Sequence, residues 1–253
     1  MKKIIFLTLV LLLLTSCISE RETGSIELHI AAASSLTNPL QELKEEYERD
    51  NAKVEIIQSF ASSGTLVQQI GQGATVDLFL SADEHWMNEA IQDQLVDETT
   101  VQTVVTNQLV LATINEQEIL LDDLTNFEFE RFSMGDPASV PAGKYAKESL
   151  EFYGLWERVK EKAVYGKNVR QALLYVESEN VVAGIVYLSD ALSSSKDLNF
   201  TIIDDESHTP IVYPVGIAKE APNENEAEKF LSFLTSDKAI TIWEKYGFKV
   251  SKE

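Results

Sequence analysis

Small and polar residues stand at four points where a predicted strand ends and a helix begins, and such residues can bind an anion. The first N–H groups of a helix have no partner within the helix and carry partial positive charge. Small side chains let a ligand approach these groups, and serine hydroxyls add further donors. The pattern predicts that a small anion is bound by neutral donors. The four segments are 34–38 (SSLTN), 62–65 (SSGT), 141–143 (PAG) and 168–170 (NVR).

The same segments also have a purely structural interpretation. Ser, Thr and Asn are the usual N-cap residues of helices, so any single segment is more often a cap than a binding site. In an open α/β sheet, however, helix starts gather at the carboxyl ends of the strands, where ligands bind. Four such segments together point toward a site, and both interpretations remain open at this step.

Short apolar runs alternate with helical patterns from residue 25 onward, which defines the elements that would hold these segments. The repeated β-α-β order predicts a mostly parallel sheet with helices on both faces. The predicted strands are 26–33, 54–60, 76–80, 108–113, 131–134, 181–188 and 211–218. The predicted helices include 143–153, 169–177 and one continuous C-terminal helix over 227–246.

The length of the chain fits two α/β lobes of about 100 residues each. No Pro- or Ser-rich linker separates the lobes in the 253-residue sequence. We therefore expect strands to cross between the lobes and the C-terminal segment to return to the first lobe.

Composition excludes several function classes. The chain has 21 Lys and Arg against 41 Asp and Glu, a net charge of −20, which repels nucleic acid and anionic lipid surfaces. A single cysteine excludes an intrachain disulfide and any multi-cysteine metal site. The three histidines, His29, His85 and His208, are too scattered to indicate a metal centre.

The N-terminus has the pattern of a secretory signal. Lys2 and Lys3 precede an apolar run over 4–14, which is too short to cross a bilayer of roughly 30 Å. The following Leu-Thr-Ser-Cys resembles the lipobox of bacterial lipoproteins, so we expect cleavage after residue 16 and a lipidated Cys17. The alternative is an ordinary signal peptide with an incidental cysteine. Removing residues 1–16 removes two lysines and no acid, so the net charge changes from −20 to −22.

Several longer motifs, in order and with few gaps, resemble those of the periplasmic molybdate-binding protein family, the substrate-binding components of molybdate ABC transporters. The resemblance spans about residues 26–250. The motifs are ASSLT at 33–37, FASSGTL at 60–66, DLFLSAD at 77–83, GDP and VPAG at 135–143, GIVY and SDA at 184–191, and YGF at 246–248.

The resemblance implies which residues contact the oxyanion. Ser35 and Ser63 would each offer a hydroxyl and a backbone N–H. Ala142 and Val169 would use backbone N–H alone, and Tyr187 its phenolic hydroxyl. Four of these five residues lie at predicted helix starts and the fifth ends a strand, which agrees with the pattern described above.

The roles of two positions near these five residues are left open by the sequence. Many family members have Ala-Ser where this chain has Ser34-Ser35, and the following Leu-Thr-Asn favours Ser35 as the contact. Arg170 follows Val169 and is the one cation beside the predicted site. A solvated or lobe-packing role is favoured for Arg170 over a direct ligand contact.

The resemblance implies a type II periplasmic-binding-protein fold, with two α/β lobes, a hinge and an interlobe ligand cleft. The expected crossings lie near Thr106 and Tyr213. The chain then divides into a signal peptide (1–16), a lipidated tether (17–25), lobe I (26–106 and 213–253) and lobe II (107–212).

The implied function is that of an extracytoplasmic protein anchored to the cell membrane through Cys17. It would bind molybdate, and also tungstate, and deliver it to a membrane permease and its ATPase. It would be a monomer with no cofactor and no metal other than molybdenum in the oxyanion. The alternatives are a binding protein for tungstate, sulfate or phosphate, or an oxyanion sensor.

The alternative from another functional class is an enzyme, and the sequence lacks the motifs that would indicate one. No G-x-S-x-G nucleophile motif occurs. Gly143-Lys144 resembles the end of a P-loop, but Ala138 and Tyr145 occupy positions that the motif assigns to Gly and to Ser or Thr. We therefore predict a binding protein without enzymatic activity.

Overall fold

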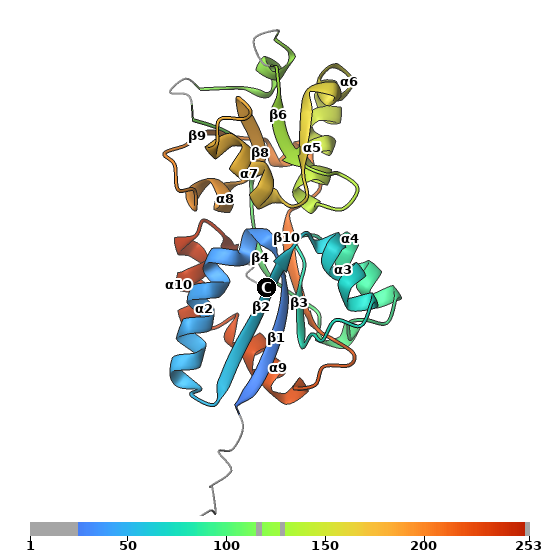
Figure 1. Cartoon of the computed structure of the whole chain (residues 1–253), viewed down its shortest axis with the longest axis vertical. Helices are drawn as coiled ribbons and strands as arrows, with labels where there is room; N and C mark the ends of the chain where they lie inside the picture. Colours follow the sequence, from blue (N-terminus) through green and yellow to red (C-terminus); the bar gives the residue numbers. More distant parts are fainter. Residues whose placement is uncertain (1–24, 115–117, 127–129, 251–253) are drawn as a thin grey trace, which may run out of the picture.

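The computed structural model describes residues 25–114, 118–126 and 130–250 and shows two α/β lobes stacked along the long axis (Figure 1). Each lobe has its own β-sheet. The predicted signal peptide, Cys17 and nearly all of the tether lie outside the described residues. No helix in the described part of the chain is both long and apolar enough to cross a membrane.

The first lobe is built on a six-stranded sheet of order β11-β4-β10-β3-β1-β2. β1 pairs in parallel with both β2 and β3, and Ile26 lies opposite Val54. β10 pairs antiparallel with β3 and β4, and β11 pairs antiparallel with β4. The strands are β1 (Ile26–Ala33), β2 (Val54–Ala61), β3 (Leu78–Leu80), β4 (Gln102–Thr106), β10 (Val212–Ile217) and β11 (Lys249–Val250).

Helices cover both faces of this sheet, α2 and α10 on one side and α3 and α4 on the other (Figure 1). α2 buries Leu40, Leu43 and Tyr47, which recur at helical spacing and face the core. The helical segments of this lobe are η1 (Ser34–Leu36), α2 (Thr37–Asp50), α3 (Ser63–Gly71), α4 (Glu84–Gln92), η2 (Glu98–Thr100), α9 (Glu224–Phe233) and α10 (Asp237–Lys245).

The second lobe has a five-stranded sheet of order β7-β6-β8-β5-β9. β6 pairs in parallel with β7 and β8, whereas β5 pairs antiparallel with β8 and β9. The strands are β5 (Leu109–Thr113), β6 (Phe132–Gly135), β7 (Ala163–Gly166), β8 (Ala183–Tyr187) and β9 (Asn199–Ile202). The helical segments are η3 (Leu121–Thr125), α5 (Pro141–Phe152), α6 (Trp156–Val159), η4 (Lys160–Lys162), α7 (Val169–Glu177), α8 (Leu188–Leu192) and η5 (Asp205–Ser207).

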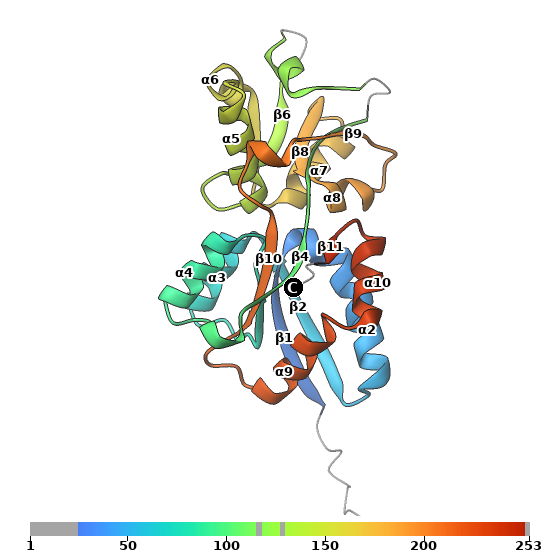
Figure 2. The same ribbon diagram turned by 180° about the vertical axis from the view of Figure 1, so that it is seen from behind.

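The chain passes between the lobes after β4 and again into β10, and these strands lie side by side (Figure 2). Their register is interrupted: Tyr213 lies opposite Val105 and Pro214 opposite Thr103, so Val104 has no partner in the ladder. Proline has no N–H to donate to a sheet, and a bulge is where a sheet tolerates it.

Two expectations from the sequence are wrong. The sheets are not mostly parallel, because five of their nine strand pairings are antiparallel. In lobe I the three antiparallel pairings all involve β4, β10 or β11, which belong to the crossings or follow the return from lobe II. The C-terminal segment is two helices, because Ser236 caps the start of α10 by accepting from Ala239 N at 3.3 Å.

Candidate anion-binding site

The five residues predicted to contact the ligand lie at the ends of elements that meet where the lobes face each other. Ser35 lies in η1, Ser63 and Val169 are the first residues of α3 and α7, Ala142 is the second residue of α5, and Tyr187 ends β8. All five are buried, with at most 3% of their surface exposed. Their burial means that a ligand there would be shielded from water.

The capping residues of α3 and α7 are not the residues predicted to contact the ligand. The hydroxyl of Ser62 caps α3 by accepting from Thr65 N at 3.3 Å, and Asn168 Oδ1 caps α7 by accepting from Gln171 N at 2.9 Å. Ser63 and Val169 each follow the cap. Helix capping therefore explains Ser62 and Asn168, and it does not use Ser63 or Val169, which could contact a ligand.

In lobe I, both serine hydroxyls are held by a hydrogen-bond partner. Ser63 Oγ accepts from Ala82 N at 3.0 Å, so its own proton is free to bind a ligand. Ser35 Oγ lies 2.9 Å from the hydroxyl of Tyr213, on β10. Asn107 Nδ2 in turn donates to that tyrosine hydroxyl at 3.2 Å.

In lobe II, the start of α5 is packed tightly against the end of β6. Pro141 occupies the first turn, where a missing N–H costs nothing. Gly143 lies against the backbone of Gly135 so closely that a Cβ atom at Gly143 would overlap its carbonyl oxygen. Glycine is required here, and the contact fixes the position of the Ala142 N–H.

The Tyr187 hydroxyl is a buried polar atom without a hydrogen-bond partner among the described residues. The side chain is 1% exposed, and its ring lies 6.0 Å from that of Tyr213, centroid to centroid. Burial raises the pKa of Tyr187 well above its ordinary value, so the hydroxyl keeps its proton. An unpaired buried donor of this kind is what a bound anion would satisfy.

Contacts between the lobes link these residues into one region. Gly64 N donates to Ser139 O at 3.2 Å, which joins the start of α3 to the loop before α5. Arg170 Nη2 donates to Asn38 Oδ1 at 2.9 Å, and α7 contacts η1. The structure thus places Ser63 near the α5 start, Val169 near η1, and Tyr187 near Ser35 through Tyr213.

Two buried carboxylates near the junction each have a cation beside them. Asp83 caps α4 by accepting from Trp86 N at 3.1 Å, and Lys144 Nζ of lobe II lies 3.7 Å from its other oxygen. Asp190 Oδ1 lies 2.8 Å from Arg170 Nε. Burial raises the pKa of Asp83, and it raises that of Asp190 to about 6 against the opposing effect of Arg170.

Arg170 therefore packs between Asp190 and Asn38, and its contacts among the described residues are those of a lobe-packing arginine. Within the same part of the chain no three His, Cys, Asp or Glu side chains are grouped so that they could hold a metal ion. The donors that the five predicted ligand residues can offer are hydroxyls and backbone N–H groups.

Sequence reasoning missed Tyr213 and Asn107 as parts of this region. It placed a chain crossing near Tyr213 but gave that residue no contact with Ser35, 178 positions away in the chain. The available signal was a tyrosine and an asparagine at the two predicted crossings, since polar side chains there must find partners when the lobes meet.

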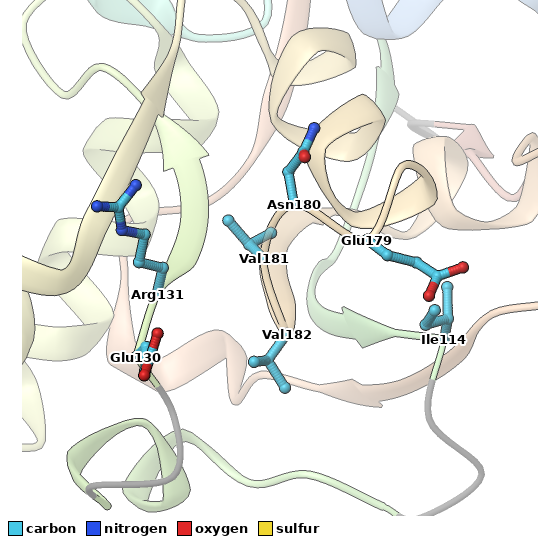
Figure 3. Close-up of a pocket in the computed structure, with 7 residues that line it drawn as sticks. All are labelled: Ile114, Glu130, Arg131, Glu179, Asn180, Val181 and Val182. Atoms are coloured by element: carbon cyan, nitrogen blue, oxygen red, sulfur yellow. The ribbon is translucent and has the colours of Figure 1, made fainter.

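A separate pocket of about 420 Å³ lies in lobe II, away from this region (Figure 3). Arg131 and Glu130 lie on one side of it and Glu179 and Ile114 on the other. Arg131 precedes β6 and Val182 precedes β8, so the pocket is at the strand ends opposite to Gly135 and Tyr187. None of the five predicted ligand residues lines it.

The known sequences that match this chain are those of solute-binding proteins. The family model described as bacterial extracellular solute-binding protein matches residues 28–249. A Bacillus subtilis relative, 41% identical over 94% of this chain and 93% of its own length, is named as a candidate substrate-binding lipoprotein of an ABC transporter. Proteins named molybdate-binding protein ModA are 38% identical in Haemophilus influenzae (89% of this chain, 91% of theirs) and 36% in Escherichia coli (88% and 89%).

Solved structures agree. The substrate-binding domain of a candidate molybdenum ABC transporter from Clostridium difficile is 36% identical, with a TM-score of 0.70 over 90% of this chain and 100% of that one. The periplasmic molybdate-binding protein of Azotobacter vinelandii is 22% identical with a TM-score of 0.83 over 89% and 100%, which shows a shared fold.

These relatives confirm the resemblance and the two-lobe fold expected from the motifs. The matched family consists of solute-binding proteins and not of enzymes, which confirms the prediction of a non-enzymatic chain. From its matched length and the identity of its relatives, the chain belongs to the family of bacterial extracellular solute-binding proteins.

Proposed function

We propose that this chain is the extracytoplasmic substrate-binding component of a molybdate ABC transporter. Molybdate, and also tungstate, would be bound between lobe I (26–106 and 213–253) and lobe II (107–212). The ligand contacts would be Ser35, Ser63, Ala142, Val169 and Tyr187. The observation that carries the proposal is the buried Tyr187 hydroxyl, which has no partner in the described chain and lies near the Ser35–Tyr213 hydrogen bond.

The donor chemistry supports a tetrahedral dianion as the ligand. Such an ion loses strong hydration on burial, so many aimed donors must replace the water. The helix starts of α3, α5 and α7 present N–H groups, and three hydroxyls add to them. Donors from both lobes stabilise the closed arrangement more than an open one, and this difference drives closure.

The net charge of −22 after removal of residues 1–16 does not oppose this function. The long-range field of the surface is screened within about 8 to 10 Å at physiological salt, whereas capture depends on donors within hydrogen-bond distance. The acidic surface slows encounter with an anion at low salt, and the buried donors determine affinity.

The proposal extends to the cell envelope. Lipidation of Cys17 would anchor a monomer to the cell membrane, with residues up to 25 as a tether to lobe I. A diacylglyceryl group supplies the two chains that stable anchoring requires. The relative named as a candidate lipoprotein supports this assignment, as do relatives whose names place them with ABC transporters. The permease and its ATPase would be the partners.

Calorimetric titration of the purified domain with molybdate, tungstate, sulfate and phosphate in parallel tests the proposal. We expect tight binding of molybdate and tungstate, and weak or no binding of sulfate and phosphate. Tighter binding of sulfate or phosphate than of molybdate would contradict it. Mass spectrometry of the membrane fraction, with Cys17→Ser as the control, tests the lipid anchor separately.

A further inference from the structure

Four polar side chains form a hydrogen-bonded chain that runs from both crossings between the lobes to the proposed site. Asn107 Nδ2 donates to Ser189 Oγ at 2.8 Å and to the Tyr213 hydroxyl at 3.2 Å. The Tyr213 hydroxyl lies 2.9 Å from Ser35 Oγ. All four side chains are buried, between 1% and 7% exposed, so water does not compete for these bonds.

The orientation of the Asn107 amide is fixed by the backbone. Gln108 N lies 2.9 Å from Asn107 Oδ1, and a backbone N–H can only donate, so the atom facing it must be the amide oxygen. The NH₂ group therefore points to Ser189 and Tyr213. An NH₂ group can only donate, so the Tyr213 oxygen accepts from Asn107.

This orientation decides the direction of the next hydrogen bond. Burial raises the pKa of Tyr213, so its hydroxyl stays protonated. Its oxygen already accepts from Asn107, and Ser35 Oγ is the neighbouring oxygen that meets hydrogen-bond geometry for its single proton, whereas the nearby Tyr187 hydroxyl does not and is itself protonated. Tyr213 then donates to Ser35, and the Ser35 proton is left to point at a ligand.

We propose that Asn107 and Tyr213 are positioning residues that hold the Ser35 hydroxyl as a hydrogen-bond donor. The inference rests on the proposed function, since it assigns Ser35 to an oxyanion site. A serine that accepts from Tyr213 and points its own proton at the ligand can accept from a protonated ligand only by turning that proton away from it. The site is therefore biased against oxyanions that carry a proton, such as hydrogen phosphate, in favour of fully ionised ones.

Tyr213→Phe removes the donor to Ser35 and keeps the ring. We expect the dissociation constant for molybdate to rise about threefold to tenfold, because Ser35 keeps its hydroxyl but loses the hydrogen bond that orients it. The freed Ser35 hydroxyl can then accept, so the ratio of phosphate to molybdate affinity should rise. Tyr145→Phe is the matched control, because that buried hydroxyl donates to Pro210 O at 3.4 Å and lies outside this chain of bonds.

Asn107→Asp reverses the polarity of the first bond at nearly constant shape. A carboxylate accepts from Tyr213, so the tyrosine no longer donates to Ser35 and the serine proton is drawn away from the ligand. The added negative charge also weakens anion binding, and a double-mutant cycle separates the two effects. The Asp should weaken molybdate binding at least about fivefold more when Tyr213 is present than in Tyr213→Phe.

The results separate this inference from the proposed function. If the natural protein binds no molybdate, the proposed function fails. If it binds molybdate but Tyr213→Phe leaves the affinity and the phosphate ratio unchanged, the positioning role is overturned. The positioning role is also overturned if Asn107→Asp weakens molybdate binding equally in the natural protein and in Tyr213→Phe. This comparison is the deciding test if Tyr213→Phe changes the thermal unfolding of the protein.

Discussion

The two halves of the proposed site are built differently. In lobe I the donors are the hydroxyl and the backbone N–H of each serine, and each hydroxyl already has a partner: Ser63 with Ala82 N and Ser35 with Tyr213. In lobe II two of the donors are backbone N–H groups, at Ala142 and Val169. The third, Tyr187, has a hydroxyl with no partner in the described chain.

This difference indicates how binding energy is distributed. The lobe I half is preorganised by its own hydrogen bonds, so it loses little freedom when a ligand arrives. The Tyr187 hydroxyl of the lobe II half has no hydrogen-bond partner among the described residues, so a ligand that accepts from it would offset the cost of burying it. We infer that lobe I selects the ligand and that lobe II gains stability from it.

The largest effect should come from removing both serine hydroxyls of the lobe I half. The double substitution Ser35→Ala and Ser63→Ala removes two hydrogen bonds to a charged ligand, each worth about 1.5 to 3 kcal/mol. Molybdate affinity should fall about a hundredfold to ten-thousandfold in calorimetry. Thermal unfolding of the empty protein should shift only slightly. Retained tight binding would remove both serines from the site.

A backbone donor of lobe II can be removed at Val169. Proline is tolerated at the first position of a helix, and the preceding Asn168 has the extended backbone (φ −157°, ψ 171°) that proline requires. Val169→Pro should weaken molybdate binding about tenfold or more, because the backbone N–H is lost. Val169→Ala, which keeps the N–H, is the control and should bind nearly as the natural protein. Equal affinities of the two variants would place this N–H outside the site.

Tyr187→Phe should separate affinity from stability. Molybdate affinity should fall about tenfold, since a hydroxyl donor is lost. The empty protein should become more stable by about 1 kcal/mol, because a buried unsatisfied hydroxyl is removed. Thermal unfolding with and without molybdate measures both effects. A lower melting temperature of the empty variant would mean that the hydroxyl has a partner in the natural protein.

The smallest expected effect is a pH dependence of stability that arises from Asp190, which pairs with Arg170 in lobe II. The pKa of Asp190 is raised to about 6 in the folded protein from an ordinary value of 3.8, so the folded state binds this proton more tightly than the unfolded state. The free energy of unfolding should therefore decrease, by on the order of 1 kcal/mol, as pH rises from about 4 to about 6.

Asp190→Asn should lack this contribution, and urea titrations at several pH values measure it. Ser35→Ala, which changes the lobe I half only, should keep the pH dependence of the natural protein. An unchanged pH dependence in Asp190→Asn would show that the Arg170 pair fully compensates the burial of the carboxylate.

Much of the fold follows from local patterns. The helix 169–177 and the strand 26–33 have the predicted bounds, because apolar periodicity and caps mark both ends. The short strands β4, β7 and β9 were not predicted, since four or five residues on or near a sheet edge carry little periodic signal. The mixed direction of the sheets was also not predicted, because direction depends on where the chain re-enters a sheet.

In the proposed site, too, local features could be predicted from the sequence and long-range contacts could not. Segments that begin helices were visible in the sequence, because small residues and caps are local signals. The bond between Ser35 and Tyr213 joins residues 178 positions apart, and the Asn107–Tyr213 bond joins residues 106 positions apart. Nothing local specifies such pairs, so the hydrogen-bond partners of the serines in the proposed site required the three-dimensional structure.

The register shift between Tyr213 and Pro214 bears on how fast a ligand leaves. The ladder between the two crossing strands skips Val104 and has no N–H from Pro214, so these strands are joined least firmly where the chain passes between the lobes. Bending should concentrate there, on the microsecond-to-millisecond scale of hinge motions. If an ion is bound between the lobes, its release requires them to separate, so the bending of these two strands would set a limit on how fast it leaves.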